Sequence, residues 1–493
     1  MTDSFADATI AGLQADLSAG RVSEAELVRH HLDRIDRLDR RGPALHAVLE
    51  LNPDAEADAG RLAAERRSGR VRGPLHGIPF LIKDNLDTAD RMHTSNGSTV
   101  MLGSRPSRDA TTVARLRAAG AILLGKTNKT SWTSGSAGWS PRGGQCRNPY
   151  APDRSPHGSS SGSAVGVAAG LATAALGTET VGSILGPAAA NAVVGVKPTT
   201  GLTSRAGMIP GIRSFDSIGP LCRTVADAAT VLTVLAGPDP RDEATAAGRG
   251  RDHGDYRDHL AADGLRGARI GVPRAVFFGY SPAADKIADA AIEAMRAAGA
   301  VIVDHADIEH AAELTRHPAI GLVVAHETRH YLDRYLAETP GDHPRSVAEL
   351  VAANRAHADV ELARFGQDML EMLAGFDADL DAPVYRGALS TVRALARDRG
   401  IDATLRRHDL DALVMPTCPP PWPIDPENGD PAPEGAAVVP GVAGYPAISV
   451  PAGFSDGLPV GITFTAGAFS EPALFRLAYA FEQICPARRP PLR

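Results

Sequence analysis

Residues 77–85 read Gly77-Ile-Pro-Phe-Leu-Ile-Lys-Asp-Asn85, an apolar run that predicts a buried β-strand ending at a lysine. Burial among Ile and Phe side chains disfavours a charged amine, so Lys83 could act as a base in its neutral form. Only five lysines occur, and the other 46 of the 51 basic residues are arginines, which stay protonated. This rarity marks Lys83 as a candidate for a role that arginine cannot fill. The alternative is a strand-ending lysine whose ammonium group lies in water.

Strand and helix patterns alternate on both sides of this run. Further strands are expected near 47–51, 121–124, 268–272, 300–303, 412–415, 447–450 and 458–464. Helices are expected within 5–40 and at 54–68, 111–119, 164–175, 283–297 and 471–483, and the region 309–375 reads as largely helical. Repeated βα units predict an α/β fold: one large domain with a central sheet covered by helices on both faces. Within it, residues 1–70 are expected to form a helical segment packed on a core of residues 71–493.

Composition and charge exclude several classes of protein. The 493 residues are 43% apolar, which supports a sizeable core, and the net charge of −7 gives no general attraction to nucleic acid or acidic membranes. No segment approaches 18 uncharged apolar residues, and the first residues lack the pattern of an export signal. The four cysteines are scattered without metal-ligand spacing, and no HExxH motif occurs. We expect a cytoplasmic protein with no metal and no other cofactor.

A serine cluster, His157-Gly-Ser-Ser-Ser-Gly-Ser-Ala164, allows three interpretations. The first is a flexible Gly/Ser loop. The second is a Gly-x-Ser-x-Gly nucleophile elbow with Ser160 as nucleophile, but that motif needs a preceding strand, and the Pro-containing run 148–157 is unsuited to one. The third is a phosphate-binding loop at a helix start, although the lysine of a P-loop is missing.

A second cluster, Gly177-Thr-Glu-Thr-Val-Gly-Ser-Ile184, places consecutive backbone amides before a serine. In a tight turn, the amides of Thr180, Val181, Gly182 and Ser183 could bind a developing oxyanion beside the Ser183 hydroxyl. An ordinary strand-to-helix turn is the alternative. Together with Lys83 and Ser159, the cluster supplies the parts of a hydrolase that uses no histidine.

These segments, in this order, resemble the amidase signature hydrolases. The resemblance runs through nearly the whole chain and is densest from Gly77 to Gly237. Besides the segments above it is carried by Gly125-Lys-Thr-Asn128, Gly195-Val-Lys-Pro-Thr199, Asp216-Ser-Ile-Gly-Pro220 and Arg223-Thr-Val-Ala-Asp-Ala-Ala229. It implies the amidase signature fold, an α/β domain whose central sheet is mixed, and hydrolysis of linear amide C–N bonds.

The resemblance also implies a Ser–cis-Ser–Lys triad. Ser183 matches the nucleophile, Lys83 the base, and Ser159 the bridging serine that follows a cis peptide bond. Ser160 matches a supporting hydrogen-bonding position, and the amides from Thr180 to Ser183 match the oxyanion hole. In the implied mechanism, neutral Lys83 takes the proton of Ser159, which takes that of Ser183 as it attacks the carbonyl. Water then cleaves the acyl-enzyme.

Three positions depart from the common family pattern. Val181 and Leu185 stand in a motif that usually reads Gly-Gly-Ser-Ile-Arg, and Ser161 replaces a glycine. The Val181 side chain could crowd the substrate, and Leu185 leaves Glu179 without its expected ion-pair partner. These variants, with Gly138-Trp-Ser-x-Arg-Gly-Gly144, Arg147-Asn-Pro-Tyr150 and Trp422-Pro-Ile-Asp425, look most like the peptide amidase branch. That branch removes C-terminal carboxamides from peptides and carries an acid where this chain has Val181.

The leading hypothesis is a serine amidase acting on a peptide C-terminal amide or a similar primary amide. One alternative is acyl transfer, in which an amine captures the acyl-enzyme in a biosynthetic pathway; another is a glutamine-hydrolysing component of a tRNA amidotransferase, which needs partner subunits. A non-catalytic amide-binding homologue is the third, and the intact set Lys83, Ser159 and Ser183 argues against it. A small-molecule or peptide amide is the expected partner, with no nucleic acid or membrane, and the chain is expected as a monomer or homodimer. Candidate pocket walls are Trp132, Trp139, Val181 and the segment around Trp422.

Overall fold

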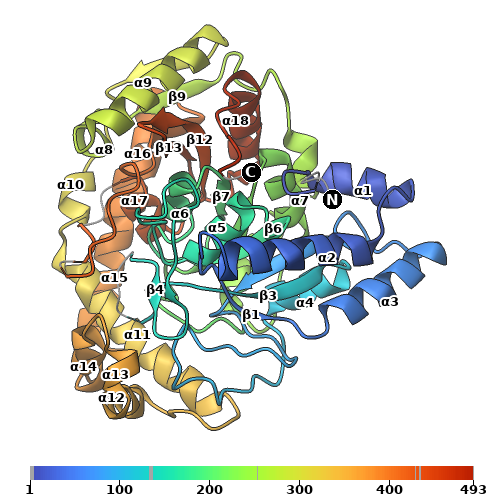
Figure 1. Ribbon diagram of the computed structural model, residues 1–493. Helices are drawn as coiled ribbons and strands as arrows, with labels where there is room; N and C mark the ends of the chain where they lie inside the picture. Colours follow the sequence, from blue (N-terminus) through green and yellow to red (C-terminus); the bar gives the residue numbers. More distant parts are fainter. Residues whose placement is uncertain (1–4, 133–136, 252–253, 428, 432–434, 492–493) are drawn as a thin grey trace.

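One mixed sheet runs through the computed structural model, which describes residues 5–132, 137–251, 254–427, 429–431 and 435–491 (Figure 1). Within these residues its eleven strands, in spatial order, are β1 (Val48–Leu51), β3 (Ile122–Thr127), β2 (Pro79–Lys83), β6 (Ala174–Glu179), β8 (Ser217–Cys222), β7 (Val194–Lys197), β12 (Ala447–Ser455), β13 (Leu458–Thr465), β11 (Ala412–Pro416), β9 (Arg269–Val272) and β10 (Val301–Asp304). β2 is parallel to β3 and β6, β9 is parallel to β10 and β11, and the other neighbouring pairs are antiparallel. The predicted mixed α/β sheet is confirmed.

Helices cover both faces of the sheet because successive residues of a strand point to opposite sides. Phe80 and Ile82 of β2 belong to one core, which also includes α1 (Ile10–Ser18), α4 (Thr111–Ala118), α7 (Val225–Leu235), α9 (Pro282–Ala297) and α18 (Glu471–Ile484). Leu81 belongs to the opposite core, with α2 (Glu24–Arg34), α3 (Ala55–Arg67), α5 (Ser161–Ala168) and α6 (Leu185–Ala190). Lys83 lies two residues beyond Leu81, so its side chain points to the α5 face.

A further group of helices packs around the β9–β11 part of the sheet and around α11. Its members are α8 (Arg274–Phe277), α10 (Ala311–Leu314), α11 (Pro318–Glu338), α12 (Val347–Ala356), α13 (Ala358–Glu361), α14 (Asp368–Ala374), α15 (Pro383–Ala396), α16 (Asp402–His408) and α17 (Val438–Ala443). Short helical turns of other types occur at Ile35–Arg40, Glu243–Gly248, Tyr256–His259 and Arg397–Ile401, and β4 (Trp139–Ser140) pairs with β5 (Gly144–Gln145) in a small hairpin. The predicted helical region over 309–375 is confirmed.

The small-residue helix predicted over 164–175 is wrong in its extent. α5 starts earlier, at Ser161, and ends at Ala168, and Ala174 already begins β6. The chain turns at Gly170, which has φ of +67° and lies so close to Ala6 that a Cβ there would be 2.9 Å from it. A left-handed glycine ends a helix, and the close approach leaves no room for a side chain.

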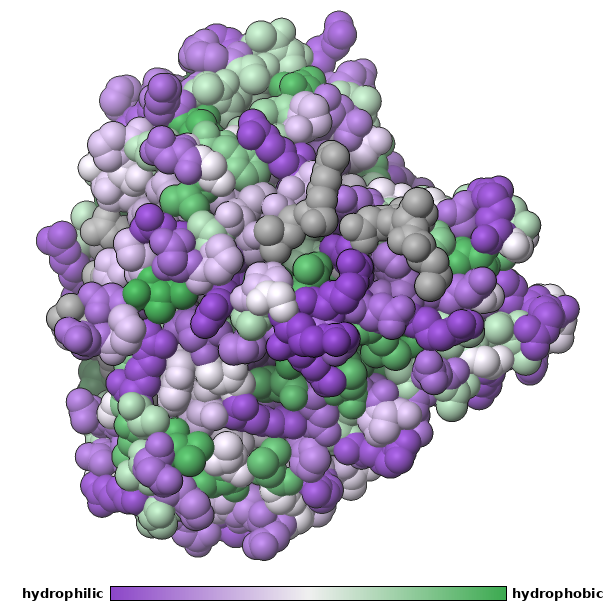
Figure 2. Space-filling model, viewed as in Figure 1, coloured by the Kyte–Doolittle hydropathy of each residue, from purple (hydrophilic) through white to green (hydrophobic). Residues whose placement is uncertain are grey.

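The surface is mixed in character. Figure 2 shows one face, on which hydrophilic residues predominate and hydrophobic residues lie in small scattered groups. No helix in the described part of the chain combines the length and apolar character needed to cross a bilayer.

Candidate active site

Lys83 is the last residue of strand β2. β2 is parallel to β3 and β6, so the C-terminal ends of the three strands lie on the same side of the sheet. The Lys83 side chain is fully buried, and its Nζ lies within hydrogen-bond distance of four oxygen atoms on two segments. They are Ser159 Oγ at 2.8 Å, Ser160 Oγ at 2.8 Å, Thr178 Oγ1 at 2.9 Å and the Thr178 carbonyl at 3.2 Å. Burial lowers the pKa of Lys83 well below its usual range, and the nearby Lys129 lowers this pKa further.

The first serine cluster reaches Lys83 from the segment before α5. The Gly158–Ser159 peptide bond is cis, as the resemblance implies. Ser160 Oγ donates to the Thr178 carbonyl at 3.1 Å while it accepts from Lys83. The preceding strand, β5, ends at Gln145, and the residues from 146 to 158 form none, so the nucleophile-elbow interpretation lacks its strand.

The second serine cluster lies beside the first. The Ser160 amide donates to the Ser183 carbonyl at 3.1 Å, which brings the turn 180–183 next to the Lys83 site. Ser183 is half-buried, whereas Ser160 is fully buried. The structure thus joins Lys83, Ser159 and Ser160 by direct side-chain hydrogen bonds and places Ser183 next to them through its backbone.

Glu179 organises the turn that carries Ser183. Its Oε2 accepts from the Ile184 amide at 2.7 Å and from the Leu185 amide at 2.9 Å, at the start of α6. Burial raises the pKa of Glu179, and hydrogen bonds from the Leu185, Ile184 and Gly182 amides and the charge of Lys197 oppose this rise. Backbone amides therefore donate hydrogen bonds to the Glu179 carboxyl group, which in the common family pattern pairs with an arginine.

Two further contacts fix the same turn. Thr180 Oγ1 donates to Asp216 Oδ1 at 2.5 Å, and Asp216 Oδ2 accepts from the Gly211 amide at 2.9 Å. On the other side α17 packs against the turn, because a Cβ at Gly441 would lie 2.8 Å from the Thr180 carbonyl oxygen. Val181, 37% exposed, points its side chain partly to solvent at this place.

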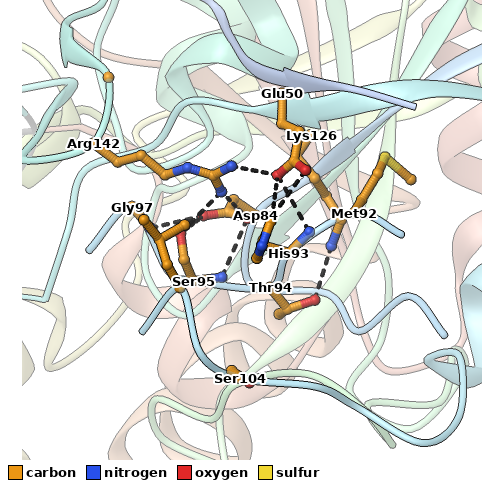
Figure 3. A network of polar contacts seen from close by, with 12 residues as sticks. Glu50, Asp84, Met92, His93, Thr94, Ser95, Gly97, Ser104, Lys126 and Arg142 are labelled. Carbon is orange, nitrogen blue, oxygen red and sulfur yellow. Dashed lines mark hydrogen bonds and ion pairs between the residues drawn. The ribbon is translucent and has the colours of Figure 1, made fainter. Parts of the chain in front are cut away.

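A polar network holds the residue that follows Lys83 (Figure 3). The Asp84 carboxylate is fully buried and accepts from the Gly97 amide at 2.8 Å and the Ser95 amide at 3.3 Å. Arg142 lies between Asp84, at 3.6 Å, and Glu50, and it forms ion pairs with both. Because these partners come from several segments, the end of β2 is fixed from more than one direction.

Four of the five lysines are buried, and three of them lie outside the predicted triad. Lys126 Nζ donates to the Leu86 carbonyl at 2.7 Å and to Thr94 Oγ1 at 2.9 Å. Lys129 Nζ donates to Asn96 Oδ1 at 2.6 Å, and burial lowers the pKa of Lys129 to about 7. Burial also lowers the pKa of Lys197 to about 8. The scarcity of lysine therefore marks buried amines in general, of which Lys83 is one.

The candidate pocket walls differ in their surroundings. Trp139 is 8% exposed and meets Phe365 edge to face, with ring centroids 5.6 Å apart. Trp422 meets the His157 ring at 5.1 Å and donates from Nε1 to Asp430 Oδ1 at 2.7 Å. Trp132 is half-buried against the core that includes α11 and α12.

Several residues of the site were not predicted. Thr178 supplies two of the four oxygen atoms around Lys83 Nζ, and Asn85 donates to Thr178 Oγ1 at 3.1 Å. Asp84, next to Lys83 in the chain, accepts from the Gly97 amide, and the charge of Lys129 lowers the pKa of Lys83. Thr178 and Asp84 lie within the motifs 177–184 and 77–85, so the sequence offered a reason to include them in the site. Nothing in the sequence around Lys129 indicated that it lies near Lys83. Among the residues that the structure describes, no group of three or more His, Cys, Asp or Glu side chains is placed to hold a metal ion.

Known proteins resemble the chain over almost its full length. The Amidase family model matches residues 26–475. A probable amidase of Arabidopsis thaliana is 37% identical over 99% of this chain and 92% of its own length. A glutamyl-tRNA(Gln) amidotransferase chain of Chloroflexus aurantiacus is 38% identical over 97% of this chain and 96% of its own length.

Solved structures show the same fold. The native peptide amidase of Stenotrophomonas maltophilia superposes with a TM-score of 0.93 at 47% identity, covering 99% of both chains. A complex of the peptide amidase PAM with the competitive inhibitor chymostatin gives a TM-score of 0.95 at 47% identity, covering 99% of this chain and 100% of that one. The chain therefore belongs to the amidase family and is an amide-hydrolysing enzyme.

Proposed function

We propose that this amidase cleaves carboxamides through an acyl-enzyme on Ser183, with Ser159 as proton relay and Lys83 as base. The observation that carries the proposal is the buried Lys83 Nζ, 2.8 Å from Ser159 Oγ and 2.8 Å from Ser160 Oγ. Because burial lowers the pKa of Lys83, a neutral amine with a free lone pair is available to accept a proton.

The hydrogen bonds around Ser160 favour one direction of proton transfer. Ser160 donates its proton to the Thr178 carbonyl at 3.1 Å, so Ser160 Oγ accepts from Lys83. The Thr178 carbonyl is also an acceptor for Lys83, since a carbonyl has no proton to give. The two N–H groups of a neutral amine are then used on these partners. In the proposed mechanism the lone pair takes the hydroxyl proton of Ser159 and not that of Thr178 Oγ1, which lies 2.9 Å from Nζ and accepts from Asn85 Nδ2.

The relay then activates Ser183. Ser159 passes its proton to Lys83 as it takes the proton of Ser183, and Ser183 Oγ attacks the amide carbonyl carbon. Backbone amides of Thr180, Val181, Gly182 and Ser183 bind the oxygen that becomes negative. The proton returns through Ser159 to the leaving nitrogen, and the C–N bond breaks. Water then gives a proton to the same relay and attacks the acyl carbon. The ester bond to Ser183 Oγ breaks, the proton returns to Ser183, and the carboxylate is released. A primary amide gives ammonia as the leaving group.

We infer that the substrate is the C-terminal amide of a peptide or a similar primary amide. The similarity to two peptide amidase structures supports this class, because identity and TM-score are both high over the full chain. The solved glutamyl-tRNA(Gln) amidotransferase chain from Thermotoga maritima is less similar, with 26% identity and a TM-score of 0.72. This difference favours a peptide-type amide over glutamine.

Ammonia release from a panel of amides tests the substrate class. Peptide amides, aryl amides and glutamine are compared by kcat/KM, and peptide amides are expected to react fastest. Faster release from glutamine, or no release from any peptide amide, would overturn the proposed substrate. Addition of hydroxylamine separates hydrolysis from acyl transfer, because an acyl-transferring enzyme would give mainly the hydroxamate while a hydrolase would still give mainly the acid.

A further inference from the structure

A large cavity lies apart from the serine and lysine residues of the active site. It has a volume of about 960 Å³ and is lined by parts of the segments 200–214 and 240–247, by the last two turns of α11, and by Arg393 and Arg397 at the end of α15. α11 and α15 pack side by side in one layer (Figure 1). Lys83, Ser159, Ser160 and Ser183 are absent from its lining. The volume is that of a site for a small organic molecule, typically about 300–1,000 Å³.

The charge of the lining is strongly positive. Six arginines face three carboxylates: Arg205, Arg213, Arg241, Arg334, Arg393 and Arg397 against Asp242, Glu243 and Glu338. Arg205 forms a two-pronged ion pair with Asp242, at 2.8 and 2.6 Å, and both are buried. Arg334 pairs with Glu338 at 2.8 Å. The lining then has one further carboxylate, Glu243, for four further arginines: Arg213, Arg241, Arg393 and Arg397.

Arg393 is the least compensated of these cations. Its Nε is buried without a hydrogen-bond partner in the described part of the molecule. Glu327 is the nearby acid, but its Oε1 accepts from Tyr385 Oη at 2.7 Å and its Oε2 from the Ser214 amide at 2.7 Å. Burial and the charge of the nearby Arg397 both lower the pKa of Arg393. Such a group gains most from an anion that enters the cavity.

Two of the other three arginines, Arg213 and Arg397, are held in place for such a contact. The Arg213 guanidinium lies over the Tyr331 ring, 5.5 Å from its centroid. Arg397 donates from Nε to the Ala443 carbonyl at 2.6 Å and lies 5.7 Å from the Tyr445 ring centroid. These contacts fix the planes of the two guanidinium groups, and further N–H groups of each remain available to a ligand. A planar guanidinium group binds phosphate through paired hydrogen bonds.

We propose that this cavity binds a small organic phosphate, with the phosphate group between Arg213, Arg393 and Arg397. A phosphate dianion offers several acceptor oxygens and two charges in one group, which suits three guanidinium groups better than a single carboxylate does. Tyr331, Tyr335 and Met208 supply aromatic and apolar surface in the same lining for the organic part.

Calorimetric titration of the full chain with pyrophosphate tests the site. We expect saturable binding with one site per chain, weakened at least tenfold by Arg393→Gln or Arg397→Gln. Arg355→Gln removes the same charge at an exposed position of α12, where Arg355 pairs with Glu371, and should change the Kd less than twofold. Ser183→Ala should bind as the wild type does, because the cavity is separate from the active site.

Three results would overturn the proposal: no saturable binding, an equal loss in Arg355→Gln, or a loss in Ser183→Ala as large as that in Arg393→Gln. Succinate distinguishes phosphate from carboxylate, and binding of succinate as tight as that of pyrophosphate would contradict the phosphate class. If Arg393→Gln fails to fold, Arg393→Lys keeps the charge but loses the planar fork. It should fold and bind pyrophosphate more weakly, and wild-type binding by this variant would contradict the role of Arg393.

Discussion

Four oxygen atoms surround the Lys83 amine, and two of them belong to Ser160 and Ser159. Of these two serines, Ser159 is the one whose hydroxyl proton is not already donated to the Thr178 carbonyl. Ser160 therefore acts in the proposed mechanism as a positioning residue, which holds the amine so that its lone pair meets Ser159. The triple serine of the sequence contains two different roles, and the local sequence cannot separate them because both depend on Thr178, 18 residues further along the chain.

Removal of the Ser160 hydroxyl should slow the reaction without unfolding the protein. In Ser160→Ala, Lys83 loses one of its fixed acceptors, and kcat/KM should fall by about 10- to 100-fold, the effect of one hydrogen bond to a charged or polarised group. Ser163→Ala is the matched control, since Ser163 lies in the first turn of α5, which directly follows the N-cap residue Ser160, and its Oγ bonds to the Leu176 carbonyl and Thr127 Oγ1 instead of Lys83. An equal loss in both variants would indicate damage to α5 and contradict the positioning role.

The charge of Lys129 should set the acidic limb of the pH profile. Lys129 lowers the pKa of Lys83, and its own pKa is about 7, so the repulsion is strongest below that pH. In Lys129→Met the pKa of Lys83 rises, and the acidic limb of kcat/KM should move to higher pH by roughly one unit. Lys286→Met, at an exposed position of α9, serves as control and should leave the limb unchanged. A limb that moves to lower pH in Lys129→Met would contradict this assignment.

At the scale of elements, the turn 180–183 lies between Glu179, Asp216 and α17. Glu179, the last residue of β6, accepts from the Ile184 amide directly after the turn, and Asp216, which precedes β8, accepts from the Thr180 hydroxyl. Gly441 of α17 approaches so closely that a Cβ would be 2.8 Å from the Thr180 carbonyl oxygen and 3.1 Å from Val181 Cγ2. The geometry of the proposed oxyanion hole therefore depends on the position of a helix that lies more than 250 residues away in the sequence.

A methyl group at position 441 should disturb the turn. Gly441→Ala should lower kcat/KM and reduce the free energy of unfolding by about 1–3 kcal/mol, because the added atom displaces α17 or the turn. Gly387→Ala makes the same change in α15, where no atom lies within 4 Å of the new Cβ, and should be stabilising by up to about 1 kcal/mol. Thermal unfolding and kinetics of the two variants provide the comparison. Full activity in Gly441→Ala would show that the turn does not depend on α17.

The sequence predicted elements with strong patterns better than elements with mixed ones. α3 and α9 begin and end within one residue of the helices expected at 54–68 and 283–297, and the strand ending at Lys83 lies where the apolar run predicted it. The strands β6 and β8 contain Gly, Thr and Ser among their apolar residues, so neither alternation nor a long apolar run revealed them. Pairing of β6 with β2 brings Thr178 to Lys83, and such long-range pairing has no local signal.

At the scale of the whole molecule, both ends of the described chain pack on α7. The Ile10 amide of α1 donates to Asp227 Oδ1 at 2.9 Å, and Glu482 of α18 accepts from the Val225 amide at 2.9 Å. β1, from the first 70 residues, adds the edge strand next to β3. The division at residue 70 stays a prediction, but this strand shows that the N-terminal segment contributes to the central sheet as well as to the helical layers.

Glu482 should make the stability of this assembly depend on pH. Burial raises its pKa to about 7, so between about pH 4.3 and 7 the folded state binds more protons than the unfolded state. The free energy of unfolding contributed by this group therefore falls as pH rises through that window. The free energy of unfolding of Glu482→Gln, measured relative to that of the wild type, should rise by about 3 kcal/mol between pH 4 and 7. Glu293→Gln, exposed on α9, is the control; an equal gain there would contradict the role of burial.

The assignment of Ser183 as nucleophile is the central claim, and covalent trapping tests it most directly. The full-length enzyme is treated with a fluorophosphonate, digested, and the adduct is located by tandem mass spectrometry. The account predicts one adduct on Ser183, its loss in Ser183→Ala, and much slower labelling in Lys83→Met, in which the base is removed. An adduct on Ser159 or Ser160, or an adduct that persists in Ser183→Ala, would contradict the account.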